Sequence, residues 1–467
     1  MKLTYTPEKE SVSVRFVESF VSRFTGSELV VGGGSAQPLT RRKVILLMRK
    51  VISLAKQNRI FSITLDWKDM RALTVDGVSD QGLGELAATA LYMADYEHIT
   101  YKHAPKEGFA FVRTVSIQGV SKEGKEGLER GQIIAREVNA CRELSNVPGG
   151  DMTPKNLSQA AKKALQGSKA TLKVLGPKEM EKLGMGAVMG IAKGSTHEPQ
   201  FIVMEYWGAG SPSTRSTRSG QLKPLVLVGK GVTFDTGGLN IKTGDHMYEM
   251  HLDMSGGAAV IHTLALVAKL KLKVNVVGLV PAVENNLSGD AVRPGDILKS
   301  LSGKTIEILN TDAEGRVILA DGITYAKRYE PAMVVDVATL TGASLIALGT
   351  QASACMTNDE SKIATIMNLA EESGDYLWPF PAWEEYEAMT KGTFADVPNI
   401  STDGNSRYGG VIAGGMFLKE FANELGCLWI HVDMAPRMTA TANEFLAKGA
   451  AGAPVRFLLK LIEHGVE

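Results

Sequence analysis

Two acidic side chains stand close together in the run Asn310-Thr311-Asp312-Ala313-Glu314-Gly315-Arg316, which follows the strand-like residues 305–309. Side chains alternate along an extended stretch, so Asp312, Glu314 and Arg316 would point to the same side. Neighbouring carboxylates repel each other unless a positive charge lies between them. A pair of divalent cations would supply that charge, and Arg316 beyond them could hold an anion.

A second polar group follows the apolar residues 225–228. Lys230 and Asp235 come directly after this predicted strand, Lys242 lies further along, and Asp253 precedes a run of small, helix-forming residues. Ligands bind at the carboxyl ends of strands in open α/β sheets. Glycines on both sides of Asp235 would let the backbone approach a ligand closely.

Each of these residues also has a purely structural interpretation. Lys230 and Asp235 could form an ion pair, Asp312 and Glu314 could cap a helix, and Asp253 could be an N-cap. Taken together, three Asp, one Glu and one Lys with no pair of histidines do not suit a single structural zinc. They suit a hydrolytic site in which carboxylates bridge two ions about 3.5–4 Å apart.

The elements that must position these residues are predicted from periodicity. A chain of 467 residues exceeds the size of one hydrophobic core, so two domains are expected. We predict an N-terminal α/β domain at 1–123, a linker helix within 124–150 and a catalytic domain at 151–467. Near-continuous apolar strands between helices after residue 150 indicate a sheet covered on both faces. Residues 208–222 are rich in Gly, Ser and Thr and predict an exposed loop.

Composition excludes several classes of protein. Lys and Arg together number 51, as do Asp and Glu, so nucleic acid or an anionic membrane is not expected as the main partner. The N-terminal residues carry charges where a signal peptide needs an apolar core. Cys141, Cys355 and Cys427 are odd in number without metal-type spacing, which favours reduced thiols and a cytoplasmic location.

Several motifs carry a family resemblance. The run NTDAEGR at 310–316 resembles the signature of the leucyl aminopeptidase family, and GKGVTFDTGGLNIK at 229–242 resembles a second block of that family. Further similar runs are NVPGGDMTP at 146–154, GMGAVMGIAKGS at 184–195, VVDVATLTGA at 334–343 and KGAAGAPVRFLLKLIE at 448–463. The resemblance covers residues 145–467. It implies a macro-like N-terminal domain, a mixed central sheet in the catalytic domain and a homohexamer.

The resemblance also implies a role for each site residue. The family's metal ligands fall on Lys230, Asp235, Asp253, Asp312 and Glu314, and its catalytic residues fall on Lys242 and Arg316. Bicarbonate would be held by Arg316 with backbone help from Ala313, Gly315 and Leu340. The pocket for the N-terminal side chain would include Met250, Thr339, Gly342, Ala435 and Met438. The cofactors would be two divalent ions, zinc or manganese, with magnesium or cobalt as alternatives.

The reaction implied is release of N-terminal amino acids from peptides. One ion would bind the free α-amine, and a water bridging both ions would attack the carbonyl. Lys230 would bind as a neutral amine with a lowered pKa. Lys242 would stabilise the oxyanion, and bicarbonate on Arg316 would shuttle the proton. The apolar, small pocket residues predict a preference for Leu or Met.

The chain departs from the family pattern at positions that bear on specificity. His251, Ser255 and Gly150 replace common Lys, Gly and Asn residues, and Pro436-Arg437 occupies a stretch that usually carries Gly and small residues. We expect the Arg437 side chain to point outward. Three other functions stay open: a metallohydrolase for Cys-Gly or β-amino dipeptides, a DNA-binding regulator and an inactive scaffold.

Overall fold

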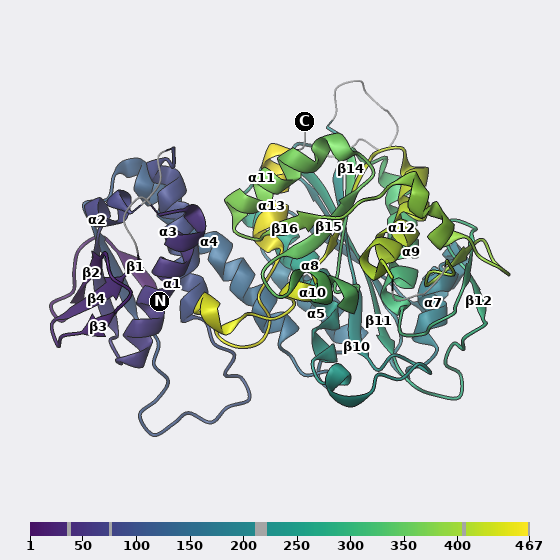
Figure 1. Ribbon diagram of the computed structural model, residues 1–467, viewed down its shortest axis with the longest axis horizontal. Helices are drawn as coiled ribbons and strands as arrows, with labels where there is room; N and C mark the ends of the chain where they lie inside the picture. Colours follow the sequence, from purple (N-terminus) through teal and green to yellow (C-terminus); the bar gives the residue numbers. More distant parts are fainter. Residues whose placement is uncertain (35–38, 74–76, 211–221, 404–407, 466–467) are drawn as a thin grey trace. The chain divides into compact units, whose positions relative to one another are not determined.

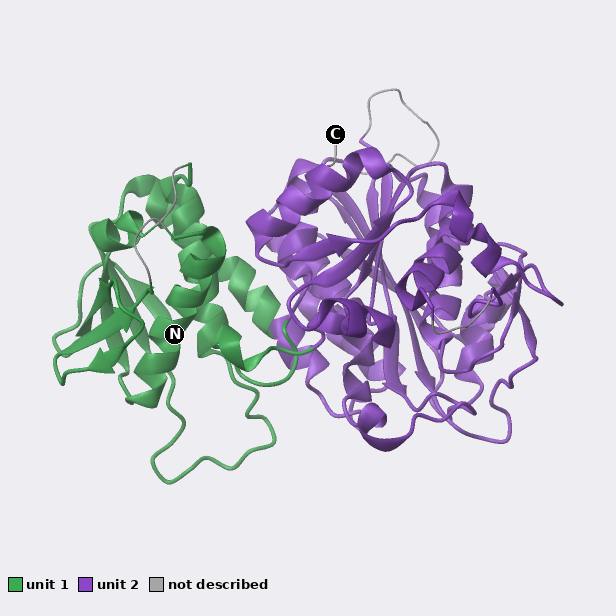
Figure 2. Ribbon diagram, in the orientation of Figure 1, with its two compact units in different colours: residues 1–139, 439–451 green, residues 140–438, 452–467 purple. Residues whose placement is uncertain are grey.

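The structure is a computed structural model that describes residues 1–34, 39–73, 77–210, 222–403 and 408–465. It divides into two compact units (Figures 1 and 2). The first comprises Met1–Asn139 with Thr439–Ala451, and the second comprises Ala140–Met438 with Gly452–Glu467. Most of the predicted loop at 208–222 lies outside the described residues. The predicted boundaries near 123 and 150 remain a sequence-based proposal beside this division.

The first unit contains a six-stranded sheet in the order β1-β6-β5-β2-β4-β3. Its pairings are parallel except for β3 against β4. The strands are β1 (Lys2–Thr4), β2 (Val12–Val17), β3 (Arg23–Phe24), β4 (Glu28–Gly32), β5 (Ser62–Asp66) and β6 (Thr114–Gln118). The helices that begin in this unit are α1 (Arg41–Gln57), α2 (Trp67–Ala72), α3 (Asp80–Asp95) and α4 (Lys122–Ser145). The predicted small α/β unit is confirmed.

Helix starts in the first unit follow from capping side chains. The Thr40 hydroxyl accepts the Lys43 N–H at the start of α1, and the Ser79 hydroxyl accepts the Gly82 N–H at the start of α3. Buried faces of α1 and α3 cover the sheet with aliphatic side chains such as Val51. The segment Thr439–Ala451 also belongs here, and its Leu446 packs against this core.

The second unit is built on a mixed nine-stranded sheet, as expected. The order is β16-β15-β18-β14-β9-β11-β8-β7, with β10 paired to β11. The strands are β7 (Thr171–Leu175), β8 (Gln200–Trp207), β9 (Leu225–Gly229), β10 (Gly231–Asp235), β11 (Asn275–Asn285), β14 (Met333–Ala338), β15 (Ser353–Thr357), β16 (Leu377–Pro379) and β18 (Leu428–Asp433). Neighbours β11, β9, β14 and β18 run parallel, so their carboxyl ends meet at one edge.

Helices cover both faces of this sheet (Figure 1). One layer contains α5 (Pro154–Leu165), α8 (Ser255–Lys269), α11 (Ile363–Ser373) and α13 (Val455–His464). The other contains α7 (Gly186–Ala192), α9 (Glu314–Ala326) and α12 (Gly410–Ala422). Each layer presents its apolar side chains to strands that are buried throughout, as β11 is. Two-sided burial explains why these strands are continuously apolar.

A small three-stranded sheet lies outside the main one and leads into the acidic motif. It consists of β12 (Ile297–Lys299), β13 (Thr305–Glu307) and β17 (Val397–Pro398). The expected extended conformation of residues 312–316 is wrong, because β13 ends at Glu307 and α9 begins at Glu314. The Asn399 side chain accepts the N–H groups of Leu309 and Asn310, which holds the chain in a turn instead.

Candidate metal centre

The polar side chains singled out by the sequence converge at the carboxyl edge of the main sheet. Lys230 stands between β9 and β10, and Asp235 ends β10. Asp253 belongs to the short helix η2 (Met250–Met254), and Asp312 and Glu314 stand at the start of α9. One carboxylate oxygen from each of Asp235, Asp312 and Glu314 lies within 4.8 Å of the others.

Two lysines hold these carboxylates together. The Lys230 ammonium lies 2.8 Å from a carboxylate oxygen of Asp253 and 2.8 Å from Glu314 Oε1. The Lys242 ammonium lies 2.8 Å from Asp235 Oδ2 and 2.5 Å from Asp312 Oδ1. All the residues predicted as ligands therefore form one cluster, in which Lys230, Asp235, Asp253 and Glu314 are buried and Asp312 is half-buried, with Lys242 at its side.

The glycine of the acidic motif has a clear packing reason. Gly315 lies against the Lys230 side chain, and a Cβ at this position would come 2.6 Å from Lys230 Cε. Such an approach is shorter than any real carbon contact. Gly315 thus lets the start of α9 carry Glu314 directly over the lysine.

Hydrogen bonds fix the individual ligands. Asp235 Oδ1 accepts the Gly237 N–H at 2.9 Å and the Asn285 side-chain amide at 2.8 Å. Asp253 Oδ1 accepts the Thr339 hydroxyl at 2.6 Å, and the Lys230 ammonium donates to the Thr339 carbonyl at 3.0 Å. Ligands held in this way need little reorganisation when an ion binds.

Burial and mutual repulsion raise the pKa values of Glu314, Asp253 and Asp312. Burial and the neighbouring Asp235 raise the pKa of Glu314 to about 8, although Lys230 opposes the shift. Burial raises the pKa of Asp253 to about 6, again against the effect of Lys230. The pKa of Asp312 is raised for the same reasons, burial first and Asp235 second. The carboxylates are thus poised to gain stability from added positive charge.

The pKa values of the two lysines are raised as well, but by attraction to the neighbouring carboxylates. Burial alone would lower the pKa of Lys230, but the negative charges of Asp253, Glu314 and Asp235 outweigh burial and raise it. The same balance raises the pKa of Lys242. The lowered pKa expected for Lys230 is therefore not a property of the ion-free cluster. Its amine would have to lose a proton as cations enter.

The donor set fits divalent cations. Asp253 Oδ2, Asp312 Oδ1 and Glu314 Oε1 are buried and lie at ion-pair distance from an ammonium, yet none accepts a hydrogen bond of good geometry from a described residue. Buried carboxylate oxygens without such partners are costly unless a cation satisfies them. Oxygen-rich sets of this kind suit manganese and magnesium, and zinc accepts them as well.

Arg316 lies beside this cluster and fits an anion. Its guanidinium is buried, and its Nε has no hydrogen-bond partner among the described residues. Burial lowers the pKa of Arg316 to about 10, against the effects of Glu314 and Asp433. The backbone N–H groups expected to help are partly engaged elsewhere, since Leu340 donates to Asp433 at 3.0 Å and Ala313 donates to Asn310 at 3.2 Å.

The predicted pocket residues come from three segments near the cluster. Met250 and Met438 are half-buried, Thr339 is buried beside Asp253, and Ala435 is half-buried. Gly342 is exposed, and a Cβ built there would meet no atom within 4 Å. The predicted pocket residues thus include two flexible thioether side chains and several small residues.

Two features of this region were missed or misjudged from the sequence. The outward orientation expected for Arg437 is wrong, because the side chain is buried and its Nη1 donates to the Thr350 carbonyl at 2.6 Å. Asp433 was not singled out, although an acid at the end of the apolar strand β18 gives the same signal as Asp235 at the end of β10. Asp433 is fully buried and accepts hydrogen bonds from Leu340, Thr341 and Ala435.

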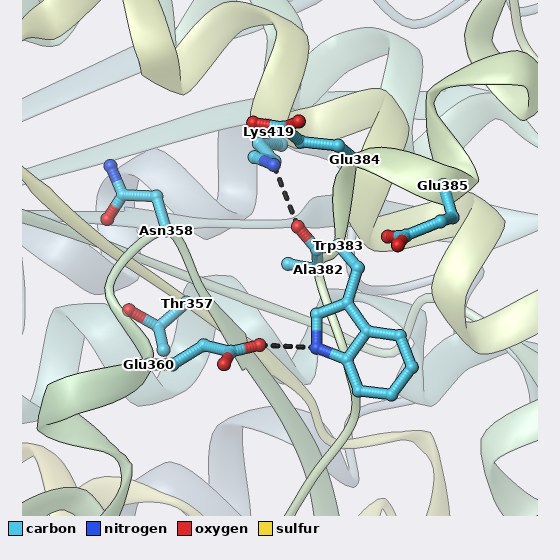
Figure 3. Close-up of a pocket in the computed structure, with 8 residues that line it drawn as sticks. All are labelled: Thr357, Asn358, Glu360, Ala382, Trp383, Glu384, Glu385 and Lys419. Carbon is cyan, nitrogen blue, oxygen red and sulfur yellow. Dashed lines mark hydrogen bonds between the residues drawn. The ribbon is translucent and has the colours of Figure 1, made fainter.

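A large hollow elsewhere in the second unit is a different kind of site (Figure 3). Its volume is about 610 Å³, and its residues include Asn358, Trp383 and Lys419. Asn358 hydrogen-bonds to Trp429 near the start of β18, so the hollow lies at the opposite edge of the sheet from the metal cluster. The Lys419 ammonium donates to the Ala382 carbonyl at 2.8 Å. No ligand of the cluster lines this hollow.

Among the described residues no helix combines the length and apolar character needed to cross a bilayer.

Comparisons with known proteins agree with this geometry. The cytosol aminopeptidase family, catalytic domain, matches residues 139–459. The chain is 43% identical over 376 residues to a probable cytosol aminopeptidase of Azoarcus sp. (strain BH72), covering 80% of this chain and 72% of the relative. It is 35% identical to a probable cytosol aminopeptidase of Vesicomyosocius okutanii, covering 96% of this chain and 88% of the relative. A solved structure of the bottromycin maturation enzyme BotP in complex with Mn is similar with a TM-score of 0.84 at 26% identity, covering 98% of this chain and 100% of that one.

Proposed function

The chain belongs to the cytosol aminopeptidase family, and from this premise we propose that it releases Leu- or Met-like residues from peptide N-termini with two bound metal ions. Membership confirms the motif-based resemblance and makes the protein a metalloexopeptidase. The observation that carries the proposal is the convergence of Lys230, Asp235, Asp253, Asp312 and Glu314 in one largely buried cluster.

We assign two divalent ions to this cluster. The ligands would be Lys230, Asp235, Asp253, Asp312 and Glu314, and the gathering of one oxygen from each of Asp235, Asp312 and Glu314 within 4.8 Å supports the assignment. When bound, such ions polarise a carbonyl and lower the pKa of a water molecule, which supplies a nucleophile at neutral pH. Manganese is the first metal to test, because the similar BotP structure is a complex with Mn.

Lys242 would stabilise the transition state. The surrounding carboxylates raise its pKa, so its ammonium stays charged at neutral pH. A fixed positive charge beside the scissile carbonyl stabilises the negative charge that develops on its oxygen. Because Lys242 contacts Asp235 and Asp312, its position is coupled to that of the ligands.

Arg316 would hold a bicarbonate ion whose role is to carry a proton from water to the leaving amine. The buried guanidinium with its unpartnered Nε supports an anion at this position. Backbone contributions from Ala313, Gly315 and Leu340 remain part of the proposal, and for Leu340 the N–H would have to leave Asp433.

The preference for Leu or Met rests on the pocket. Met250 and Met438 can adapt to varied apolar groups, and Gly342 and Ala435 leave room for a long or branched side chain. Thr339 would close the base of the pocket beside Asp253.

A homohexamer in the cytoplasm completes the proposal. Its support is the family resemblance and the naming of the relatives as cytosol aminopeptidases. Large apolar side chains such as Tyr248, Ile346 and Phe394 are exposed on the second unit and would suit contacts between copies. Light scattering of the purified protein tests the assembly.

Hydrolysis of aminoacyl-p-nitroanilides tests the activity. The protein should lose activity on exhaustive chelation and regain it with Mn²⁺ or Zn²⁺. Full activity after metal removal verified by elemental analysis would overturn the two-metal assignment. No activity on any aminoacyl substrate with any of these ions would overturn the proposed function.

A further inference from the structure

The short helix α10 (Gly342–Leu348) forms one side of the proposed substrate pocket but has little packing of its own. Ser344 is its only buried side chain, whereas Leu345 is 44% exposed and Ile346 is 89% exposed. An isolated helix of this length is not stable in water. Its position must therefore be set by its surroundings, which include α12, β15 and the hydrogen bonds at its two ends.

The N-terminal end of α10 is tied to Asp433. The Thr341 hydroxyl accepts the Ser344 N–H at 3.2 Å as the helix cap and donates to Asp433 Oδ2 at 2.6 Å. The Leu340 N–H donates to Asp433 Oδ1 at 3.0 Å. Because Asp433 is fully buried, these hydrogen bonds are shielded from water.

The C-terminal end of α10 is tied to Arg437. The helix ends at Gly349, which adopts a φ of 62°, and the next carbonyl, that of Thr350, accepts Arg437 Nη1 at 2.6 Å. The Arg437 side chain is only 8% exposed. Because this hydrogen bond comes from a charged donor and is shielded from water, it helps to hold the carbonyl in a defined place.

Both ties begin in one short segment, residues 433–437, which also carries pocket residue Ala435 and leads into Met438. Asp433 itself accepts the Ala435 N–H at 3.2 Å, and the helix η7 (Ala435–Arg437) packs against α10. One wall of the proposed pocket, α10, is thus bound at both its ends to the other wall, segment 433–437.

We propose that Arg437 is a specificity-determining positioning residue: by holding the C-terminal end of α10 against segment 433–437, it sets the width of the pocket for the substrate's N-terminal side chain. The inference rests on the proposed function, because it takes Gly342, Ala435 and Met438 as the pocket walls. Arg437 donates its hydrogen bond to the Thr350 carbonyl and is not among the residues proposed as ligands. It stands in a stretch where the family resemblance leads one to expect Gly and small residues.

The test compares Arg437→Met, Arg437→Lys and the control Lys419→Met. Lys419 resembles Arg437 in donating from a cationic side chain to a backbone carbonyl, that of Ala382, but it lies at the hollow on the other edge of the sheet (Figure 3). Lys419→Met removes the same charge and the same kind of hydrogen bond. For each protein kcat and KM are measured for Ala-, Leu- and Met-p-nitroanilide, together with metal content and hydrogen exchange of residues 342–352.

Arg437→Met should lower the Leu/Ala ratio of kcat/KM about fivefold or more, mainly through KM, because a pocket of undefined width discriminates less. Metal content should be unchanged, and exchange at 345–349 should be faster. Arg437→Lys should restore most of the ratio, and Lys419→Met should leave both readouts as in the wild type. A Leu/Ala ratio within about twofold of the wild type in Arg437→Met, or an equal change in Lys419→Met, would overturn the inference.

Hydrogen exchange separates this inference from the proposed function. If the wild type hydrolyses no aminoacyl substrate, the proposed function fails. Slow hydrogen exchange in α10 that becomes faster in Arg437→Met would still show that the Arg437–Thr350 hydrogen bond holds the helix. Unchanged hydrogen exchange of α10 in Arg437→Met would overturn the inference that Arg437 positions this helix, whatever the activity.

Discussion

The Thr311 backbone N–H donates a 2.8 Å hydrogen bond to the side chain of Asn240, 71 residues earlier in the chain. The Thr311 hydroxyl also donates to the Gly237 carbonyl at 2.6 Å. The segment that carries Asp235 and Lys242 is thereby fastened to the segment that carries Asp312 and Glu314. Neither half of the metal cluster is held in place by its own strand alone.

Substitution of a proposed metal ligand should have a different effect from substitution of the neighbouring Lys242. Glu314→Gln should lower both metal content and turnover, because an amide oxygen carries no charge to hold a cation. Lys242→Ala should keep its metal and lose about 10²–10³ in kcat, the usual cost of removing a preorganised electrostatic stabiliser. Elemental analysis beside steady-state kinetics distinguishes the two, and loss of metal in Lys242→Ala would show that Lys242 helps to hold the ions.

Gly315→Ala should displace Lys230 from the cluster. The added methyl group would come 2.6 Å from Lys230 Cε, so the lysine or the start of α9 must shift. We expect weaker metal binding, measured by titration calorimetry, and a lower melting temperature. Gly150→Ala is the matched control, since a Cβ there meets nothing within 4 Å. Equal metal affinity in the two variants would contradict the packing argument.

Asp321 should make stability depend on pH. Its carboxylate accepts the Val188 N–H at 2.9 Å and the Leu301 N–H at 2.7 Å. Burial nevertheless raises the pKa of Asp321 from 3.8 to about 7. The folded protein then binds a proton that the unfolded chain has lost, so this contribution to stability is complete below the unfolded pKa and disappears as pH rises through the folded one.

The corresponding measurement compares the wild type with Asp321→Asn in urea between about pH 5 and pH 8. The free energy of unfolding of the wild type, relative to the variant, should fall by about 1.4 kcal/mol per pH unit up to about pH 7 and then level off. A difference independent of pH would mean that the backbone hydrogen bonds keep the carboxylate ionised throughout.

Substrate preference should follow the apolar walls of the pocket. Dipeptides that begin with Leu or Met should be cleaved with a kcat/KM at least about tenfold above one that begins with Gly. An N-terminal Asp should be disfavoured, since it would bring an unpaired carboxylate into an apolar cavity. Arg437 offers that carboxylate no help while its guanidinium is bonded to the Thr350 carbonyl. An Asp peptide as the best substrate would show that Arg437 turns into the pocket.

The sequence predicted the layers of the catalytic unit because its strands are apolar on both sides, as β9 and β14 are. The meeting of Lys230 and Asp235 with other acids could be expected because charged residues directly after such strands have few structural uses, and their role as metal ligands stays a prediction. The geometry of residues 312–316 could not be predicted, since the turn depends on Asn399, which contacts it from more than eighty positions away. The orientation of the Arg437 side chain could not be predicted either, because it depends on a hydrogen bond to the Thr350 carbonyl in another segment.

The return of residues 439–451 to the first unit bears on the order of events during synthesis. Leu446 packs into a core whose other members lie within the first 130 residues, and Glu444 lies 3.6 Å from Arg49. The first unit can therefore complete its core only after residues 439–451 have been synthesised. By then nearly all of the second unit has already emerged from the ribosome. Domains usually fold one after another as they appear. Here the N-terminal unit is begun first and completed almost last.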